Sequence, residues 1–361
     1  MAERDFSLCH RGLLALALCL ANACQTQDDK PPRPAEPAPE TAHWMADVFA
    51  DRPEMTIGQI LLPGAFNSTS YACDVEHGIS PDSPELVYGL WGENDAVAND
   101  EMRDRIVGWS RHQGRSVGQQ LEDGIRFVEM NVTMKEGVVT TWHSVYGVPL
   151  GDVLDELVAF AVAWPDEVVV VTFGLSIDSA DWPALTELLV ESRAHGVSFC
   201  DLVYDGTEDA AQATLADVGD ANRNLIWSPS GDLRLFLEES GDCPLSQGGT
   251  DRSWSVTATT SGTEDALSAS VDSRDPSHLL INDFAFSLDG AEGVAGQAEF
   301  LLNYEGVQET SLVLGFAGDF PERMISAFDG NGNMNIFAGA YYEDTTLVEA
   351  AIARNRARLT P

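Results

Sequence analysis

The chain has 361 residues, of which 44% are hydrophobic and 22% are charged. This balance predicts at least one large globular core and excludes a disordered acidic tail. Lysine and arginine together number 20 against 58 acids, which gives a formal net charge of -38. Because so acidic a chain lacks the basic surface that neutralises phosphates along DNA or RNA, nucleic acid is not an expected partner.

The N-terminus has the pattern of an export signal. An apolar run at 13–21 follows two arginines, is too short to span a bilayer, and leads to small residues just before Cys24. Two cleavages fit a signal peptide at 1–23: a lipoprotein cut that leaves Cys24 as the lipidated first residue, or a cut that gives a secreted form. Residues 24–50 are rich in proline and glutamate, as in a tether. The expected location is the cell envelope, in the periplasm or at the outer membrane, or outside the cell.

From about residue 51 to 361, strand-like and helix-like stretches alternate, which favours one β/α domain. The apolar run 168–173 predicts a strand covered on both faces in a parallel sheet. The other predicted strands are 57–62, 125–132, 138–143, 224–227, 278–286, 311–316 and 335–341, and the predicted helices include 99–109, 116–122 and 182–194. About eight strands interleaved with helices predict a (β/α) TIM-like barrel of irregular form. A doubly wound open sheet is the alternative, but no GxGxxG follows any predicted strand.

Three cysteines remain after the signal segment and Cys24: Cys73, Cys200 and Cys243. An odd number permits one disulfide and one free thiol, and the sequence does not say which residues pair. No CxxC spacing is present, so a zinc site is not expected.

Polar side chains follow two predicted strands at the point where active-site loops of barrels begin. The first predicted strand ends in a Pro63-Gly64 turn, and Phe66, Asn67 and Ser68 come directly after it. A later short strand ends in His143. A lone histidine is more often structural than catalytic, so its meaning depends on what lies near it.

The predicted strand 125–132 carries polar residues two positions apart. Glu129 and Asn131 share one face with Phe127, while Arg126 lies on the other face among apolar residues. Polar residues on one face of an otherwise apolar strand predict a lined barrel interior. The same alternation directs Arg126 outward, where it is suited to pair with an acid behind the site.

In order and spacing, these segments resemble the X-domain phosphatidylinositol-specific phospholipase C family. That family has a Pro-Gly turn followed by histidine, then a Gln-Leu-x-x-Gly-hydrophobic-Arg segment and a strand that ends in histidine. The corresponding residues here are Pro63-Gly64, Gln120–Arg126 and His143, and the resemblance spans most of 55–355. It implies a (β/α) barrel that cleaves the phosphodiester of phosphatidylinositol or a related phospholipid head group, with a role in lipid metabolism.

Several positions depart from the family pattern. The family's first histidine, a general base, corresponds to Phe66, which cannot accept a proton. His143 stands at the position of the second histidine, the general acid. Metal-independent members carry an arginine where this chain has Asn131, and Ser144 replaces a glycine. The resemblance therefore implies His143, Glu129 and Asn131 as the catalytic candidates.

The resemblance also implies a metal site. Metal-dependent members hold calcium with an asparagine after the first histidine and a Glu-x-Asp pair, and the matching residues are Asn67, Glu129 and Asn131. Oxygen ligands suit Ca²⁺, which is the one cofactor that these residues suggest. Asn67 and Arg126 are in addition candidate contacts to the substrate.

Three functions remain open from the sequence. The first is a phosphoric diester hydrolase of the phospholipase C type. The second is a catalytically impaired relative that binds an inositol, sugar or phospholipid head group, because a lost general base typically costs about 10²–10⁴-fold in rate. The third is a glycosidase on a similar barrel, which rests only on the abundance of acids. Whether the chain is an enzyme is not decided by the sequence.

Overall fold

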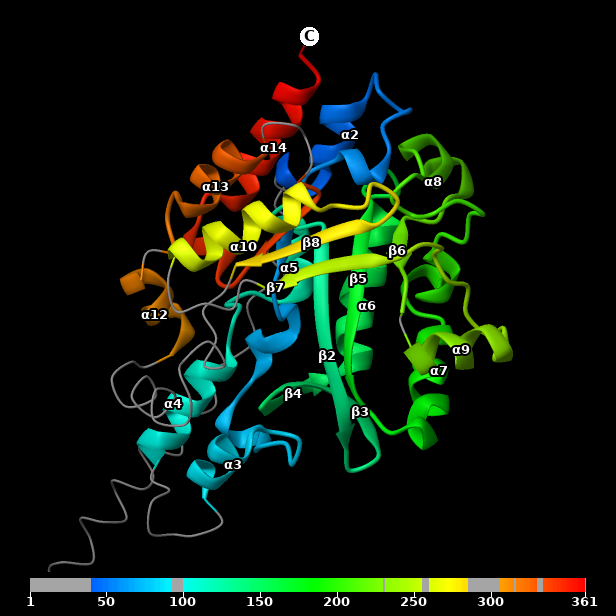
Figure 1. The fold of residues 1–361 in the computed structure, drawn as a ribbon. Helices are drawn as coiled ribbons and strands as arrows, with labels where there is room; N and C mark the ends of the chain where they lie inside the picture. Colours follow the sequence, from blue (N-terminus) through cyan, green and yellow to red (C-terminus); the bar gives the residue numbers. More distant parts are fainter. Residues whose placement is uncertain are drawn as a thin grey trace, which may run out of the picture. The chain divides into compact units, whose positions relative to one another are not determined.

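The computed structural model describes residues 40–92, 100–229, 231–254, 260–284, 306–314, 316–329 and 334–360. Within them, strands and helices alternate as a β/α domain, which Figure 1 traces in chain order. The expected signal peptide and its Cys24 lie outside the described residues. In this described part, no helix is both long and apolar enough to cross a membrane.

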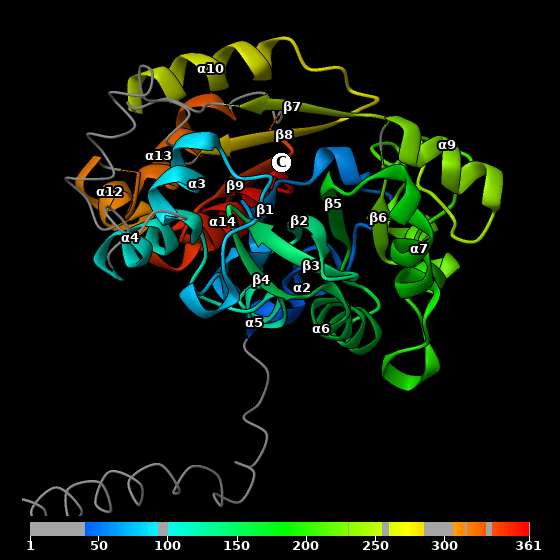
Figure 2. The same cartoon turned by 90° about the horizontal axis from the view of Figure 1, so that it is seen from below.

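Parallel strands form the body of the sheet, in the order β6, β5, β2, β1, β9, β8, β7. Their bounds are β1 Leu62–Ala65, β2 Phe127–Lys135, β5 Val169–Ser176, β6 Leu225–Trp227, β7 Thr250–Trp254, β8 Leu279–Phe284 and β9 Ile336–Gly339. Figure 2 shows these strands as an arc with helices outside it. No ladder joins β6 to β7 among the described strands, so the barrel is open there.

A hairpin extends β2 beyond the barrel and returns the chain to it. β3 (Val138–His143) pairs antiparallel with the far half of β2, and β4 (Val145–Pro149) pairs with β3. The turn between β2 and β3 is Glu136-Gly137, and both residues have positive φ, 52° and 83°. Such a two-residue turn matches the twist of a hairpin, and it brings His143 back toward the barrel.

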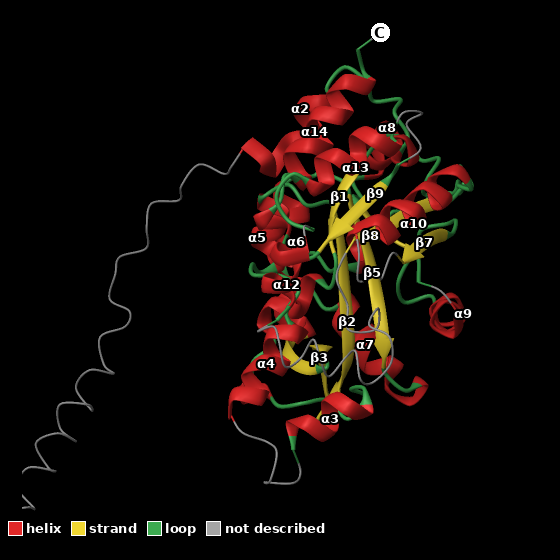
Figure 3. Cartoon of the chain, turned by 60° about the vertical axis from the view of Figure 1, so that its left-hand side comes forward, coloured by secondary structure: helices red, strands yellow, loops and turns green. Residues whose placement is uncertain are grey.

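Helices cover the outside of the sheet, as Figure 3 shows in red around the yellow strands. Ser116 caps α5 with a reciprocal capping box to Gln119, and Thr214 caps α8 in the same way with Asp217. The bounds are α2 Trp44–Phe49, α3 Glu85–Trp91, α4 Asp100–Ser110, α5 Val117–Glu122, α6 Leu150–Ala163, α7 Trp182–Val190, α8 Leu215–Ala221, α9 Gly231–Ser240, α10 Thr260–Asp272, α12 Val307–Leu314, α13 Phe320–Phe328 and α14 Leu347–Arg358.

Most predicted strands overlap observed ones, namely β2, β3, β5, β6, β8 and β9. The predicted strand 57–62 is wrong, because Ile57–Gln59 is a 3-10 turn with a capping box and β1 starts only at Leu62. The predicted strand 311–316 is also wrong, since Val307–Leu314 is helix α12. A short apolar run fits either period, and only its surroundings decide between strand and helix.

The N-terminal boundary of the domain also differs from the expected one. The tether was expected to reach residue 50, but residues 44–49 form α2, and Trp44, Met45 and Phe49 are buried in the core. The domain therefore begins near Glu40 rather than at 51. A helix of 6 residues is too short to show a clear period in the sequence.

A buried ion pair joins this N-terminal helix to the barrel. Arg126, at the start of β2, donates to Glu167 Oε2 from Nε at 2.8 Å and from Nη2 at 2.5 Å, and both side chains are fully buried. Glu167 also accepts the backbone N–H of Ala46 at 2.9 Å. Burial lowers the pKa of Arg126 and raises the pKa of Glu167, and their mutual attraction opposes both shifts.

A disulfide joins Cys200 to Cys243 with their Cα atoms 5.1 Å apart. Cys73 is a buried free thiol. The count expected from the sequence, one disulfide and one free thiol, is confirmed, and the structure supplies the pairing.

Glu167→Gln should lower the free energy of unfolding by about 3–5 kcal/mol, because it leaves the buried Arg126 charge without its partner. Denaturation followed by circular dichroism measures this loss. Glu54→Gln is the matched control, since Glu54 pairs with Arg52 at 2.6 Å but is 63% exposed. It should change stability far less than Glu167→Gln, because water and salt screen an exposed pair. Equal losses in the two variants would contradict the role given to the buried pair.

Candidate active site

The turn after β1 begins the site. Asn67 follows β1 with φ of 49°, a left-handed conformation that asparagine adopts more readily than most residues. Its backbone N–H donates to Glu129 Oε2 at 3.0 Å, and the next residue, Ser68, accepts the Glu129 N–H on Oγ at 3.0 Å. The turn after β1 is therefore held against the middle of β2 by two buried hydrogen bonds.

β2 directs Glu129 and Asn131 to the barrel interior, as their alternation predicted. Asn131 Nδ2 donates to Asn67 Oδ1 at 2.5 Å, which joins the two amides. On β5, Gly174 pairs with Asn131, and a Cβ at Gly174 would overlap Asn131 Oδ1. Glycine is the residue that leaves room for this amide.

His143 closes β3 beside the same cluster. Its Nδ1 lies 3.0 Å from the carbonyl oxygen of Ser110, and because a carbonyl only accepts, Nδ1 carries a proton. Nε2 is therefore the nitrogen that gains and loses the exchangeable proton. The ring is partly exposed, unlike the amide of Asn67, which is buried.

His112, in the loop between α4 and α5, joins His143 to the turn after β1. The two imidazole centroids are 4.5 Å apart in an edge-to-face arrangement. His112 Nδ1 lies 2.9 Å from Asn67 Nδ2, and its ring packs on Phe66 at 5.2 Å. A second imidazole thus lies beside the phenylalanine that stands at the base position.

Arg252 and Asp283 bring charge to the site from the opposite wall. Arg252, on β7, pairs with Glu129 Oε1 at 2.5 Å and with Asp283 Oδ2, on β8, at 2.6 Å. The guanidinium lies 5.8 Å from the centroid of the Phe66 ring. Arg252 keeps 21% of its side chain exposed, while both carboxylates are buried.

Two carboxylates share this one cation. Burial raises the pKa of Asp283 to about 7, and the nearby Glu129 adds to the rise while Arg252 opposes it. For Arg252, burial lowers the pKa, but Glu129 and Asp283 raise it further, so the guanidinium stays protonated. The cluster therefore keeps one protonated cation beside a carboxyl group whose pKa burial raises.

The structure brings together most of the residues selected from the sequence. Asn67 contacts both Glu129 and Asn131, and His143 joins them through His112. Arg126 does not belong to this cluster. It is fully buried on the outer face of the sheet against Glu167, which excludes the expected substrate contact and matches the outward direction of its alternation.

The same residues do not fit a calcium ion. Glu129 already accepts Arg252 on one oxygen and the Asn67 N–H on the other, and the amides of Asn67 and Asn131 bond to each other. Within the described ranges, no group of three or more His, Cys, Asp and Glu side chains is arranged for a metal. A cation next to Glu129 would have to displace the guanidinium of Arg252.

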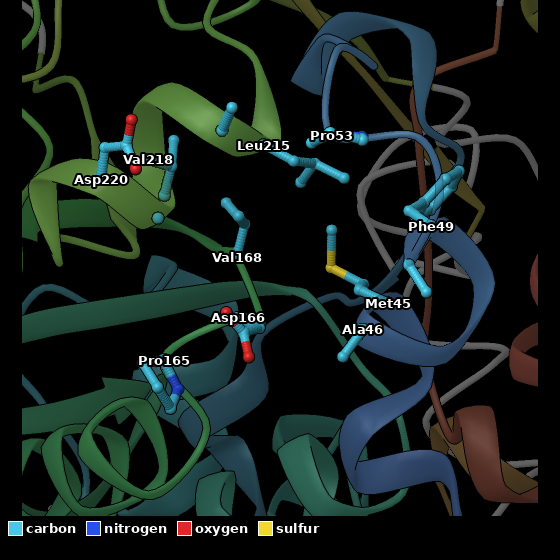
Figure 4. Close-up of a pocket in the computed structure, with 13 residues that line it drawn as sticks. Met45, Ala46, Phe49, Pro53, Pro165, Asp166, Val168, Leu215, Val218 and Asp220 are labelled. Atoms are coloured by element: carbon cyan, nitrogen blue, oxygen red, sulfur yellow. The ribbon is translucent and has the colours of Figure 1, made fainter.

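A cavity of about 540 Å³ lies at the other end of the barrel, where β5 begins. Figure 4 shows Met45 and Phe49 from α2, Val168 before β5, and Leu215 from α8 at its walls. The catalytic candidates lie at the carboxyl ends of the strands, which is where barrel enzymes place their chemistry. This cavity is therefore no part of the candidate site.

Comparison with known proteins supports the resemblance to the X-domain family. No protein-family model matches the chain. The mouse PI-PLC X domain-containing protein 2 is 27% identical over 136 residues, which cover 37% of this chain and 38% of that protein. The variant-surface-glycoprotein phospholipase C of Trypanosoma cruzi is 32% identical over 124 residues, covering 32% of this chain and 31% of that protein. The resemblance to the X-domain family is confirmed. The chain spans about a third of the length of these curated relatives.

Solved structures extend the likeness to the whole barrel. The phosphatidylinositol-specific phospholipase C of S. aureus superposes with a TM-score of 0.56 at 14% identity, covering 87% of this chain and 97% of that one. The enzyme from Listeria monocytogenes gives 0.55 at 15% identity, covering 87% and 98%. The (β/α) barrel fold is thereby confirmed.

Sequence reasoning missed three residues of the site: His112, Arg252 and Asp283. Asp283 had a usable signal, because an acid inside the apolar run 279–284 resembles Glu129 inside β2. Arg252 lies on β7, which was not predicted at all, and His112 lies in a loop between helices. Neither residue belongs to a local pattern that assigns it to a site.

Because Arg252 occupies the carboxylate of Glu129, Ca²⁺ should raise the melting temperature of the parent no more than NaCl of equal ionic strength does. Arg252→Met should be less stable, because two buried carboxylates then lack a counter-charge. Calcium should raise its melting temperature selectively, since a ligand that binds only the folded state stabilises it. Differential scanning fluorimetry measures both. A calcium-specific rise in the parent would show that the site does admit the metal.

Proposed function

We propose that the chain is a phospholipase C-like phosphoric diester hydrolase that acts on phosphatidylinositol or a related phospholipid head group. One observation carries the proposal: two partly exposed residues, His143 and Arg252, belong to one cluster at the carboxyl ends of the barrel strands, linked through His112 and Phe66. An imidazole transfers protons near neutral pH, and a guanidinium binds phosphate oxygens.

Arg252 supplies the positive charge for the phosphodiester. Its position between Glu129 and Asp283 fixes the plane of the guanidinium, so little side-chain entropy remains to be lost when an anion binds.

In the first step, the oxygen of a ring hydroxyl forms a bond to phosphorus while the bond from phosphorus to the glycerol oxygen breaks. His143 gives the proton on Nε2 to the departing glycerol oxygen. The proton of the attacking hydroxyl passes to water, since Phe66 stands where the family has its base. Water then opens the cyclic phosphodiester. Without a positioned base we expect turnover slower by about 10²–10⁴-fold than that of a complete acid-base pair.

Phe66 also favours a second candidate function, binding of the same head group without turnover. The phenyl ring packs on His112 and on Arg252, so it contributes to the site as an apolar wall. A pocket that keeps the cation and loses the base retains affinity while losing rate.

Purified protein incubated with phosphatidylinositol micelles should release a cyclic inositol phosphate, which ³¹P NMR detects. His143→Ala should reduce the rate by at least about 10²-fold, because the departing oxygen then leaves without a proton. His195→Ala, at an exposed position remote in sequence from the site, is the control and should keep the parent rate.

Unchanged turnover in His143→Ala would contradict the assigned acid. No turnover in the parent, together with calorimetric binding of inositol 1-phosphate that Arg252→Gln abolishes, would favour the binding function instead. If the parent protein shows neither turnover nor binding, both candidate functions are contradicted.

We propose further that the protein is exported and anchored to a membrane of the cell envelope through lipid on Cys24. Support comes from the signal-like segment 1–23 and the proline-rich stretch after it. The anchor would place the barrel next to its lipid substrate.

Cys24→Ser should move the protein from the detergent phase to the aqueous phase in Triton X-114 partitioning, because the lipidated residue is lost. Mass spectrometry of the parent N-terminus should find a diacylated Cys24. An unmodified N-terminal residue in the parent would support the secreted form.

A further inference from the structure

The loop that carries His112 is held by contacts from several sides. The backbone N–H of His112 donates to Ser70 Oγ at 2.8 Å, and its carbonyl accepts the N–H of Tyr341 at 2.6 Å. The next residue, Gln113, donates from Nε2 to the carbonyls of Phe66 at 2.7 Å and Gly339 at 2.8 Å. The imidazole is thus fixed to the ends of β1 and β9, although it comes from neither strand.

The ring nitrogen of His112 ends a directed chain of hydrogen bonds. Asn131 Nδ2 donates to Asn67 Oδ1, so the other end of the Asn67 amide, Nδ2, faces His112 Nδ1. An amide nitrogen only donates, and therefore Nδ1 of His112 has to accept. If the Asn67 amide alone were turned over, its NH₂ group would face the NH₂ group of Asn131. The direction of this hydrogen-bond chain is therefore set jointly by Asn131, Asn67 and His112.

The two touching imidazoles consequently differ in tautomer. His143 carries its proton on Nδ1, where it donates to Ser110, while His112 accepts on Nδ1. We infer that His112 is a positioning residue of the active site: as a neutral imidazole it orients the Asn67–Asn131 amide pair through Nδ1 and holds the His143 ring through its edge-to-face contact.

The expected effect of His112 on the reaction rate rests on the proposed function. The tautomers of His112 and His143 and the contacts of His112 do not depend on turnover. His112 is 2% exposed, so it acts through its neighbours and not on the substrate. Its two contacts can be removed one at a time, because the contact with Asn67 needs a hydrogen-bond acceptor and the contact with His143 needs a ring. For an ordinary buried core residue, different substitutions would not affect binding and rate separately.

The first test needs no substrate. Long-range ¹⁵N–¹H spectra of histidine-labelled parent protein distinguish a protonated from an unprotonated Nδ1, and the variants His112→Asn and His143→Asn assign the signals. We expect an unprotonated Nδ1 in His112 and a protonated Nδ1 in His143 at neutral pH. A protonated Nδ1 in His112 would overturn the inference.

The second test separates the two contacts. His112→Asn keeps an acceptor near the position of Nδ1 and loses the ring, whereas His112→Phe keeps a ring and loses the acceptor. The Asn variant should bind inositol 1-phosphate within about two-fold of the parent but lower kcat about ten-fold, because His143 loses its support. The Phe variant should weaken binding about ten-fold and keep kcat, because the amide of Asn67 loses its partner.

His195→Asn is the control, since its position is exposed and its φ of 58° suits asparagine. Melting temperatures show whether each variant is folded. Equal losses of binding and kcat in both variants, alongside unchanged His143 spectra, would overturn the positioning role. If the parent shows no turnover, the proposed function fails, while the binding and spectral results still decide the role of His112.

Discussion

The carboxylate of Glu129 is the interaction on which the arrangement of the site depends. One oxygen accepts the Asn67 N–H from the turn after β1, and the other binds Arg252 from β7. β2 is therefore tied through the barrel interior both to the turn after β1 and to β7, which is three strands further along the sheet from β1. Because Asp283 shares the same guanidinium, removing the charge of Glu129 would change the position of Arg252 and the protonation of Asp283 together.

This constraint changes the meaning of the departures from the family pattern. The arginine expected on β2 is Asn131, yet a guanidinium reaches Glu129 from β7. The imidazole expected at Phe66 is absent, yet His112 packs against that phenyl ring from a loop between helices. The interior of a barrel is filled by side chains from many strands and loops, so one chemical group has several routes to the same place. In a barrel, the loss of one motif residue is therefore weak evidence that the function is lost. In a site built on a single loop, the same loss would be stronger evidence.

Features with a local period in the chain could be predicted from the sequence. The alternation in 125–132 predicted the inward face of β2 and the outward direction of Arg126, and the apolar run 168–173 predicted β5. Contacts between distant segments could not be predicted in this way: His112 lies 45 residues from Asn67, and Arg252 lies 123 residues from Glu129. Such pairs leave no period in the chain, because only the closing of the barrel brings them together.

Backbone strain at the strand ends supports the view that this geometry is fixed before a ligand binds. Ser144, after β3, has φ of 61°, and Tyr341, after β9, has φ of 45°. Left-handed conformations of such residues cost about 1–3 kcal/mol and persist only where the surroundings enforce them. Here the Ser144 carbonyl accepts from the N–H of Ser80 and the hydroxyl of Ser83, and the Tyr341 N–H donates to His112. Both strained residues thus adjoin the imidazole pair, one next to His143 in the chain and one bonded to His112. No residue within β3 or β9 has a positive φ, so the strain lies just beyond their ends, next to the imidazole pair. This is what a preorganised site requires, whether it cleaves its phosphodiester or only binds it.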